Sequence, residues 1–151
     1  MVPKLIDKLL DQSLVLIVDK YANYVIQTIL KKNNKNYGNK FAEKIKDNVV
    51  YYAKNKYSSN VVRECLDCCD GIYLLNLISN VQQRDNLIEL ILDEHGNYIA
   101  QKVLILSTPI MQTKMLKIIK ENLNRLKKRY HGEILINKLI ANYPIINNKN
   151  F

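Results

Sequence analysis

Glycine and proline are scarce in this sequence, with 4 Gly and 3 Pro among 151 residues, and tryptophan is absent. So few turn-forming residues exclude a collagen-like or linker-like chain and argue against a turn-rich all-β fold. No apolar run reaches the roughly 18 residues that a membrane-spanning helix needs. Asp7 and Lys8 also interrupt the segment in which a signal peptide would be apolar. We therefore expect a single soluble, intracellular domain.

Cysteine is also rare, and its arrangement argues against both disulfides and a metal. Cys65, Cys68 and Cys69 are an odd number within a short segment and make a poor disulfide framework. Their spacing resembles half of a zinc site, but no second pair lies near it in the sequence. The sequence also contains no nucleophile–base constellation and no glycine-rich phosphate loop. We therefore expect neither an enzyme nor a cofactor.

Acidic residues are outnumbered, since 23 Lys and Arg stand against 14 Asp and Glu and leave a formal charge of +9. Such an excess suits a polyanionic partner. The chain is also rich in Lys, Asn and Ile, which use A/T-rich codons, so a biased genome is an alternative source of the charge. Arg125, Lys127, Lys128 and Arg129 form one basic cluster. This cluster is either a solvated helix face or a contact for phosphates that flank recognised bases.

A nine-residue segment occurs three times at a nearly constant spacing. Residues 19–27 (DKYANYVIQ) return as 55–63 (NKYSSNVVR) and again as 93–101 (DEHGNYIAQ). A degenerate fourth copy begins near Arg129. Self-similarity at a period of 20–50 residues is the mark of a repeat architecture.

Each copy has the apolar spacing of a helix, with apolar residues at positions such as Val25, Ile26, Ile29 and Leu30. An apolar run precedes each copy and an amphipathic run follows it, so each repeat holds three helices. The predicted runs are Leu14–Val18, Val49–Ala53 and Leu87–Leu92 before the copies, and Phe41–Ile45, Tyr73–Ile78 and Met111–Ile119 after them. A single unit cannot bury its apolar stripe alone and must stack on its neighbours. The predicted fold is an all-α, right-handed α-solenoid of three-helix repeats, an armadillo-like superhelix.

We expect one repeat domain over residues 1–151. Its predicted parts are a partial repeat helix at 1–10, repeats at 11–47, 48–83 and 84–121, a C-terminal cap at 122–143 and a tail at 144–151. The tail is expected to be frayed, and Lys31–Asn39 is expected to be a polar connection. Asp19, Asn55 and Asp93 precede the three copies, where their side chains are expected to cap free N–H groups at the helix start.

The polar residues of each copy lie on a different helix face from the apolar stripe. The carboxamides of Asn23 with Gln27, and of Asn97 with Gln101, offer both donors and acceptors for the edge of a uracil base. Tyrosines beside them are suited to stacking on bases. Single-stranded RNA is the expected ligand because its unpaired bases can be splayed out one per repeat. This interpretation requires that Asn23, Ser59 and Asn97 lie on one surface that is open to solvent.

The sequence resembles the C-terminal part of a Pumilio-family (PUF) RNA-binding domain, its last three repeats plus the cap. The resemblance rests on residues 23–27, 59–62 and 97–101 and on the cap-like residues 131–135. It implies a non-catalytic binder of mRNA that controls translation or decay through 3′-untranslated elements and recruited proteins, in the cytoplasm or, alternatively, the nucleus or nucleolus. The RNA-binding residues implied are Asn23, Tyr24, Gln27, Ser59, Asn60, Arg63, Asn97, Tyr98 and Gln101.

The middle repeat departs from the family pattern. The family usually recognises guanine there with a Ser and, four residues later, a Glu, but here Ser59 is followed by Arg63 and the Glu stands at position 64. A guanidinium only donates, which suits the O2 and N3 acceptors of cytosine, and family precedent also pairs a small residue and Arg with cytosine. Glu64 could instead turn to a guanine, or Arg63 could bind a phosphate. The expected core is 5′-U-[C or G]-U.

Two other functions are compatible with these residues. A helical-repeat scaffold that binds protein would need no polar residues in register. A divergent nucleolar relative that binds ribosomal RNA would respond to shape and phosphates more than to bases, with a steep salt dependence.

Overall fold

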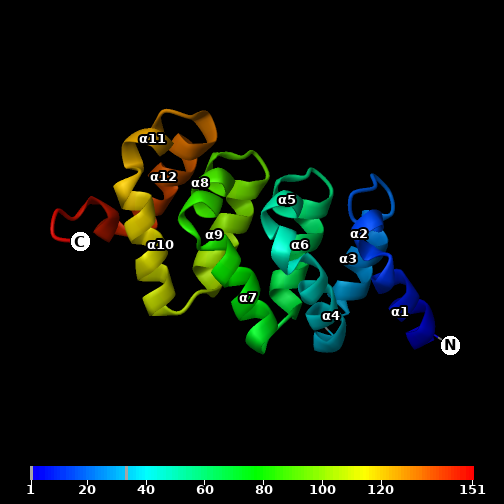
Figure 1. Cartoon of the computed structure of the whole chain (residues 1–151). Helices are drawn as coiled ribbons and strands as arrows, with labels where there is room; N and C mark the ends of the chain where they lie inside the picture. Colours follow the sequence, from blue (N-terminus) through cyan, green and yellow to red (C-terminus); the bar gives the residue numbers. More distant parts are fainter. Residues whose placement is uncertain (1, 33) are drawn as a thin grey trace. The chain divides into compact units, whose positions relative to one another are not determined.

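The computed structural model of the chain describes residues 2–32 and 34–151 and shows helices but no strand among them (Figure 1). The chain divides into a first unit that ends at Asn80 and a second unit over Val81–Phe151. The helices that begin in the first unit are α1 (Val2–Asp11), α2 (Ser13–Leu16), α3 (Asn23–Lys31), α4 (Lys35–Ile45), η1 (Lys46–Asn48), α5 (Val49–Lys54), α6 (Ser58–Cys68) and α7 (Gly71–Val81). The second unit holds α8 (Arg84–Leu92), α9 (Gly96–Leu106), α10 (Pro109–Glu121), α11 (Leu123–Lys127), α12 (Tyr130–Asn142) and η2 (Pro144–Asn147). No helix in the described part of the chain is long and apolar enough to cross a membrane.

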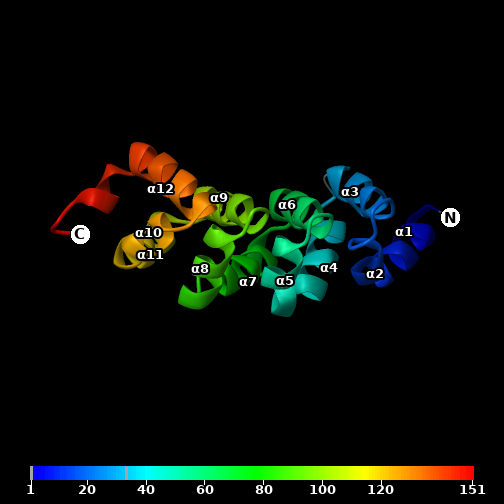
Figure 2. The same cartoon turned by 90° about the horizontal axis from the view of Figure 1, so that it is seen from above.

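The first unit is held together by the apolar stripes that the repeat spacing predicts. α6 packs against α3, α4 and α5, and Ile26, Leu30 and Val62 are almost completely buried. Figure 2 shows α3 and α6 on one side of this unit and α2 and α5 on the other. Burial of such side chains stabilises a fold by about 1.5–3 kcal/mol each.

The contact between α4 and α6 depends on a glycine. A Cβ atom at Gly38 would lie 2.6 Å from Cys68 Sγ and 2.9 Å from the Cys68 carbonyl oxygen, so a larger residue would push the helices apart. All three cysteines are buried, and burial raises the pKa of the Cys68 thiol to about 12. Cys65 is therefore a core residue, at the same repeat position as the buried Ile29 and Val103. The described residues contain no cluster of His, Cys, Asp and Glu that could hold a metal ion.

In the second unit, α8 packs against α9 and α12, and α12 also contacts α9 and α11. Figure 2 shows α9 and α12 on one side of this unit and α8, α10 and α11 on the other. Leu87, Ile91, Val103 and Ile136 are almost completely buried between these helices. The degenerate fourth copy of the repeat therefore forms a helix that completes the apolar core of this unit.

The three motif helices begin in the same way, and the predicted capping is confirmed. The Asp19 carboxylate accepts hydrogen bonds from the N–H groups of Tyr21 at 2.8 Å and Ala22 at 2.7 Å. These two bonds lower the pKa of Asp19. Asn55 and Asp93 each accept from the N–H groups two and three residues later, at 2.6–3.0 Å. A side-chain oxygen at this place satisfies N–H groups that the helix leaves free.

Two predicted segments differ from the structure. The polar connection expected over Lys31–Asn39 is shorter, because Asn34 accepts from the Asn36 N–H at 2.9 Å and caps a helix that already begins at Lys35; residue 33 lies outside the described residues. The tail is not frayed, because Ile146 is fully buried. Lys120 also donates hydrogen bonds to the backbone carbonyls of Asn148 and Phe151.

Candidate functional site

The predicted binding residues lie in the N-terminal halves of three helices. Two of these helices, α3 and α6, belong to the first unit, and the third, α9, belongs to the second. In α3, Asn23 is only 1% exposed. Its side-chain nitrogen donates to the carbonyls of Asp19 at 2.8 Å and Lys20 at 3.0 Å. Its side-chain oxygen accepts from Gln27 Nε2 at 2.8 Å. Both donors of Asn23 are thus bound to the loop before the helix, so only its oxygen faces Gln27 and fixes the orientation of the Gln27 carboxamide.

Asn97 and Gln101 of α9 form the same pair. The Asn97 side-chain nitrogen donates to the carbonyls of Asp93 at 2.8 Å and Glu94 at 3.0 Å. Its oxygen accepts from Gln101 Nε2 at 3.3 Å. One contact differs from those described for the Asn23–Gln27 pair: Lys138 Nζ of α12 donates to Gln101 Oε1 at 2.9 Å. In the second unit the glutamine is therefore held from both ends.

The middle repeat has a looser arrangement at the start of α6. The Ser59 hydroxyl donates to the Lys56 carbonyl at 3.4 Å, and the Asn60 side chain donates to the same carbonyl at 3.4 Å. Arg63 is exposed, and its side chain makes no hydrogen bond or ion pair with any residue that the structure describes. The Glu64 carboxylate lies 3.7 Å from Lys31 Nζ of α3. Arg63 is thus free to meet a ligand, whereas Glu64 is engaged.

The residues beside these pairs are open to solvent. Tyr24 is 64% exposed and Tyr98 is 57% exposed. Asn60 is exposed as well. Their positions leave two aromatic rings and one carboxamide available for stacking against planar groups, which contributes about 1–3 kcal/mol per base in nucleic-acid complexes.

The expectation that Asn23, Ser59 and Asn97 are open to solvent is wrong for the chain without a ligand. They are 1%, 8% and 7% exposed, respectively. The physical reason is that their polar groups bind the carbonyls of the turn before the helix, where no intrahelical partner exists. Arg63 is exposed and Gln101 is partly exposed, whereas Gln27 is 8% exposed, as buried as Ser59.

Sequence reasoning missed the contacts that Lys138 and Glu64 make with neighbouring helices. Each of these residues lies 37 residues after a glutamine of the motif, Gln101 and Gln27, respectively. The repeat period could therefore have identified both as the next-repeat neighbours of an Asn–Gln pair. Their opposite charges make the surroundings of the two pairs different.

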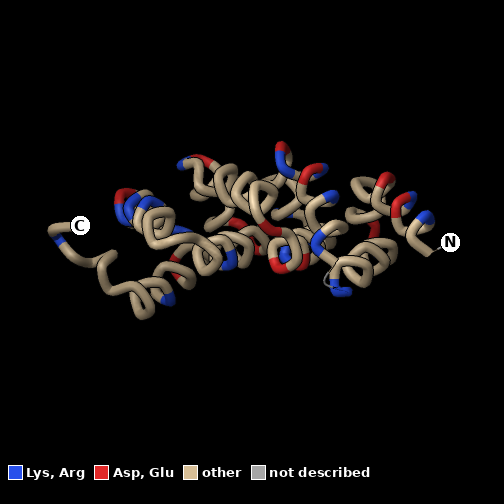
Figure 3. The backbone as a smooth tube through the Cα atoms, turned by 90° about the horizontal axis from the view of Figure 1, so that it is seen from below, with Lys and Arg blue, Asp and Glu red and all other residues tan. Residues whose placement is uncertain are grey.

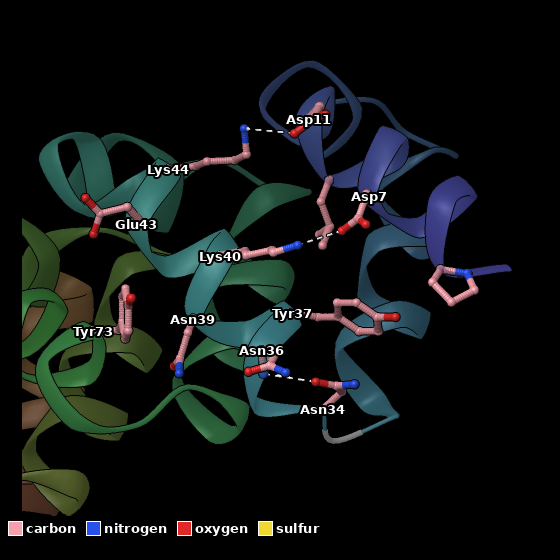
Figure 4. Close-up of a pocket in the computed structure, with 12 residues that line it drawn as sticks. Asp7, Asp11, Asn34, Asn36, Tyr37, Asn39, Lys40, Glu43, Lys44 and Tyr73 are labelled. Carbon is pink, nitrogen blue, oxygen red and sulfur yellow. Dashed lines mark hydrogen bonds and ion pairs between the residues drawn. The ribbon is translucent and has the colours of Figure 1, made fainter. Parts of the chain in front are cut away.

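A separate hollow of about 1070 Å³ lies between α1 and α4 in the first unit (Figure 4). Two ion pairs cross the gap: Lys40 Nζ lies 2.7 Å from Asp7 Oδ1, and Lys44 Nζ lies 3.9 Å from Asp11 Oδ1. Hydrogen bonding to Asp7 raises the pKa of Lys40. None of the predicted binding residues lines this hollow. The candidate binding residues in α3 and α6 of the first unit, and those in α9 of the second unit, therefore lie outside this hollow.

Comparison with known proteins agrees with these repeats. Residues 14–38, 48–82 and 86–120 match the model of the Pumilio-family RNA binding repeat. A Pumilio domain-containing protein of Schizosaccharomyces pombe is 25% identical over 143 residues, which are 95% of this chain and 21% of that protein. The chain thus spans about a fifth of the length of this relative.

Solved structures confirm the all-α repeat fold. A crystal structure of PUF-8 in complex with PBE-RNA matches 93% of this chain and 42% of its own, with a TM-score of 0.83 at 19% identity. The Puf3 RNA binding domain, bound to a 3′ UTR recognition sequence of Cox17 RNA, matches 89% of this chain and 39% of its own, with a TM-score of 0.76 at 21% identity.

Proposed function

Since the chain belongs to the Pumilio family, a family of RNA-binding repeats and not of enzymes, we propose that it binds single-stranded RNA with sequence specificity, one base per repeat. The observation that carries this proposal is the recurrence of one hydrogen-bonded Asn–Gln pair at the start of α3 and of α9. The same carboxamide pair in two repeats is suited to recognising the same base at two positions of the RNA.

The pairs suit uracil. In each pair the asparagine oxygen accepts from the glutamine nitrogen and so sets which end of the glutamine carboxamide is the donor. The second hydrogen of Nε2 can donate to a uracil carbonyl, and Oε1 can accept the uracil N3–H. Gln27 and Gln101 therefore contact the base, while Asn23 and Asn97 are positioning residues that act through them.

The middle base of the proposed core is cytosine, with guanine as the alternative. Arg63 is exposed and has no partner in the described chain, so its donors are available for the O2 and N3 acceptors of cytosine. Guanine would need a carboxylate to accept from N1–H and N2–H. The nearest one, Glu64, is paired with Lys31. The proposed core is thus 5′-U-C-U, with Tyr24, Asn60 and Tyr98 stacked between or against the bases.

We also propose a cytoplasmic role in controlling translation or decay of mRNA, with recruited proteins. This role is supported by the likeness to Puf3, whose RNA-binding domain was solved on a 3′ UTR recognition sequence.

The proposal is tested by titrating the chain with short RNAs that carry U-C-U, U-G-U or A-A-A cores at one stated salt concentration. We expect the U-C-U core to bind tightest, since a wrong base contact costs about 1–3 kcal/mol. Arg63→Glu should move the preference to U-G-U, because a carboxylate replaces the guanidinium. Equal binding of all three cores would contradict sequence specificity. No binding at all would favour a protein-binding scaffold.

A further inference from the structure

Residues 125–129, outside the helices that carry the Asn–Gln pairs, form a positively charged segment. Arg125, Lys127, Lys128 and Arg129 are all exposed, whereas Leu126 between them is fully buried. None of the four charged side chains makes a hydrogen bond or an ion pair with any described residue of the chain. The buried leucine thus anchors a segment whose four cations all remain unpaired. We call these four residues the basic surface.

Among the residues that the structure describes, no acidic side chain pairs with the basic surface. No acidic residue occurs between Asn122 and Gly132. Glu121, the nearest acid before the segment, is bound by Arg84, which lowers the pKa of the Glu121 carboxyl. Arg129 itself stands at the repeat position that Asp19, Asn55 and Asp93 occupy in the other copies. The segment therefore attracts an external anion.

The basic surface lies in α11 and in its link to α12, whereas the Asn97–Gln101 pair lies in α9. α11 contacts α8 and α12, and α12 contacts α9. Within the second unit, α11 lies on the side opposite to α9 and α12 (Figure 2). Figure 3 shows the Lys and Arg positions gathered there, near the C-terminal end of the chain. Because α9 and α11 lie on different sides of the second unit, we assign this surface to a part of the ligand other than the base that lies against Gln101.

The chemistry of the surface suits an RNA backbone. Four unpaired cations in five residues match a ligand with one negative charge per nucleotide. Arg groups bind phosphate oxygens in a bidentate fashion, and Lys groups act as point charges. Tyr130 follows directly and is 73% exposed, which adds a ring for stacking on an unpaired base. An acidic protein segment would use the charges but not the ring.

We propose that the basic surface binds the phosphates of nucleotides that flank the core, as a second RNA contact without base specificity. This inference rests on the proposed function for the identity of the ligand. Because the basic surface and the Asn97–Gln101 pair both belong to the second unit, we expect an extension at the end of the core that contacts α9 to reach it.

The test compares two variants of the full chain that lose the same charge. One carries R125Q, K127Q, K128Q and R129Q and keeps Leu126. The control carries K4Q, K8Q, K32Q and K149Q, which are exposed lysines outside the surface. Each is titrated with the U-C-U core alone and with the core extended at its 5′ or 3′ end by about ten nucleotides, a length within the site sizes of single-strand binders. The milder variant K127Q/K128Q serves if the fourfold variant does not fold.

We expect the surface variant to bind one of the extended RNAs about tenfold more weakly than the control variant does, with a salt dependence less steep by about 0.7 for each phosphate that the variant no longer neutralises. Its preference for U-C-U over A-A-A should be unchanged. Equal decreases in affinity in the two variants, or an equal decrease with the unextended core, would overturn the inference. The wild-type chain could bind U-C-U and A-A-A equally and still bind an extended RNA more tightly than the surface variant does. That result would contradict the proposed sequence specificity but support RNA binding by the basic surface.

Discussion

The Asn23–Gln27 pair of α3 and the Asn97–Gln101 pair of α9 have the same residues and the same hydrogen bonds, but neighbours of opposite charge. Beside Gln101 stands Lys138, which donates to its oxygen at 2.9 Å. The residue equivalent to Lys138 in the first unit is Glu64, whose carboxylate turns to Lys31 at 3.7 Å. The glutamine oxygen therefore already accepts one hydrogen bond in one pair, which leaves its second lone pair for a base, and has no described partner in the other.

The comparison distinguishes two features of a repeat: the hydrogen bonds that orient its carboxamides, and the charge that the next repeat places nearby. The backbone carbonyls before the helix orient the asparagine, and the asparagine orients the glutamine, in both pairs alike. The next repeat then adds a charged residue, which contacts the glutamine at Gln101 and Lys31 in the first unit; under the proposed function this charge tunes how the glutamine contacts a base. Two repeats with the same residues at the base-contact positions can thus differ in affinity because of a residue on the neighbouring helix.

The largest expected effect is on stability and should be the same for both pairs. Asn23→Ala and Asn97→Ala each remove bonds to two backbone carbonyls and to a glutamine, all with little access to water. We expect each to lower the free energy of unfolding by about 2 kcal/mol. Chemical denaturation measures this.

The matched control is Asn23→Ser, because Ser59 bonds to the equivalent carbonyl, that of Lys56 just before α6. It should cost less than Asn23→Ala. If only one of the two alanine variants is less stable, the hydrogen bonds of the two asparagines do not contribute equally to stability.

The second effect concerns affinity and should distinguish the pairs. Lys138→Glu replaces the donor to Gln101 with an acceptor, which favours the reversed orientation of the Gln101 carboxamide. We expect binding of a U-C-U RNA to weaken about fivefold, with the decrease confined to the uracil that faces α9. Lys114→Glu, an exposed residue of α10 with the same change in charge, is the control, and an equal decrease there would mean that only net charge matters.

A smaller effect is expected at Glu64. Glu64→Gln breaks an exposed ion pair with Lys31, and such pairs contribute about 0–1 kcal/mol. The preference for the middle base should not change, because the proposed function assigns it to Arg63. Weaker binding of guanine by this variant would instead show that Glu64 contacts the base.

The smallest effect is a pH dependence of the Asp19 cap. Hydrogen bonds from the Ala22 and Tyr21 N–H groups hold the pKa of Asp19 below its usual value of 3.8. The stabilisation is therefore present above that value and is lost as the pH falls through the lower, folded pKa. Asp19→Asn should remove this dependence while keeping the cap, since Asn55 caps α6 in the same way. Unfolding midpoints between about pH 2 and pH 5 would be compared, and identical pH profiles for the two proteins would contradict the assignment.

The repeats, the three motif helices and their caps could be predicted from the sequence, because periodicity and Asx residues act locally. The burial of Asn23 and Asn97 could not. An asparagine at a helix start has two competing sets of partners, the backbone carbonyls and a ligand, and spacing does not decide between them. The contacts of Lys138 and Glu64 depend on which helices are neighbours, and the packing of Ile146 depends on a tertiary surface that residues 144–151 do not themselves reveal.

The most direct test of base recognition is the NMR spectrum of the side-chain amides, recorded as a U-C-U RNA is added. We expect the side-chain amide resonances of Gln27 and Gln101 to shift. We also expect their amide hydrogens to exchange more slowly with water. The Asn23 and Asn97 amides, already bonded to carbonyls, should be protected before RNA is added and should stay so. Saturated RNA binding that leaves both glutamine resonances unchanged would contradict the account.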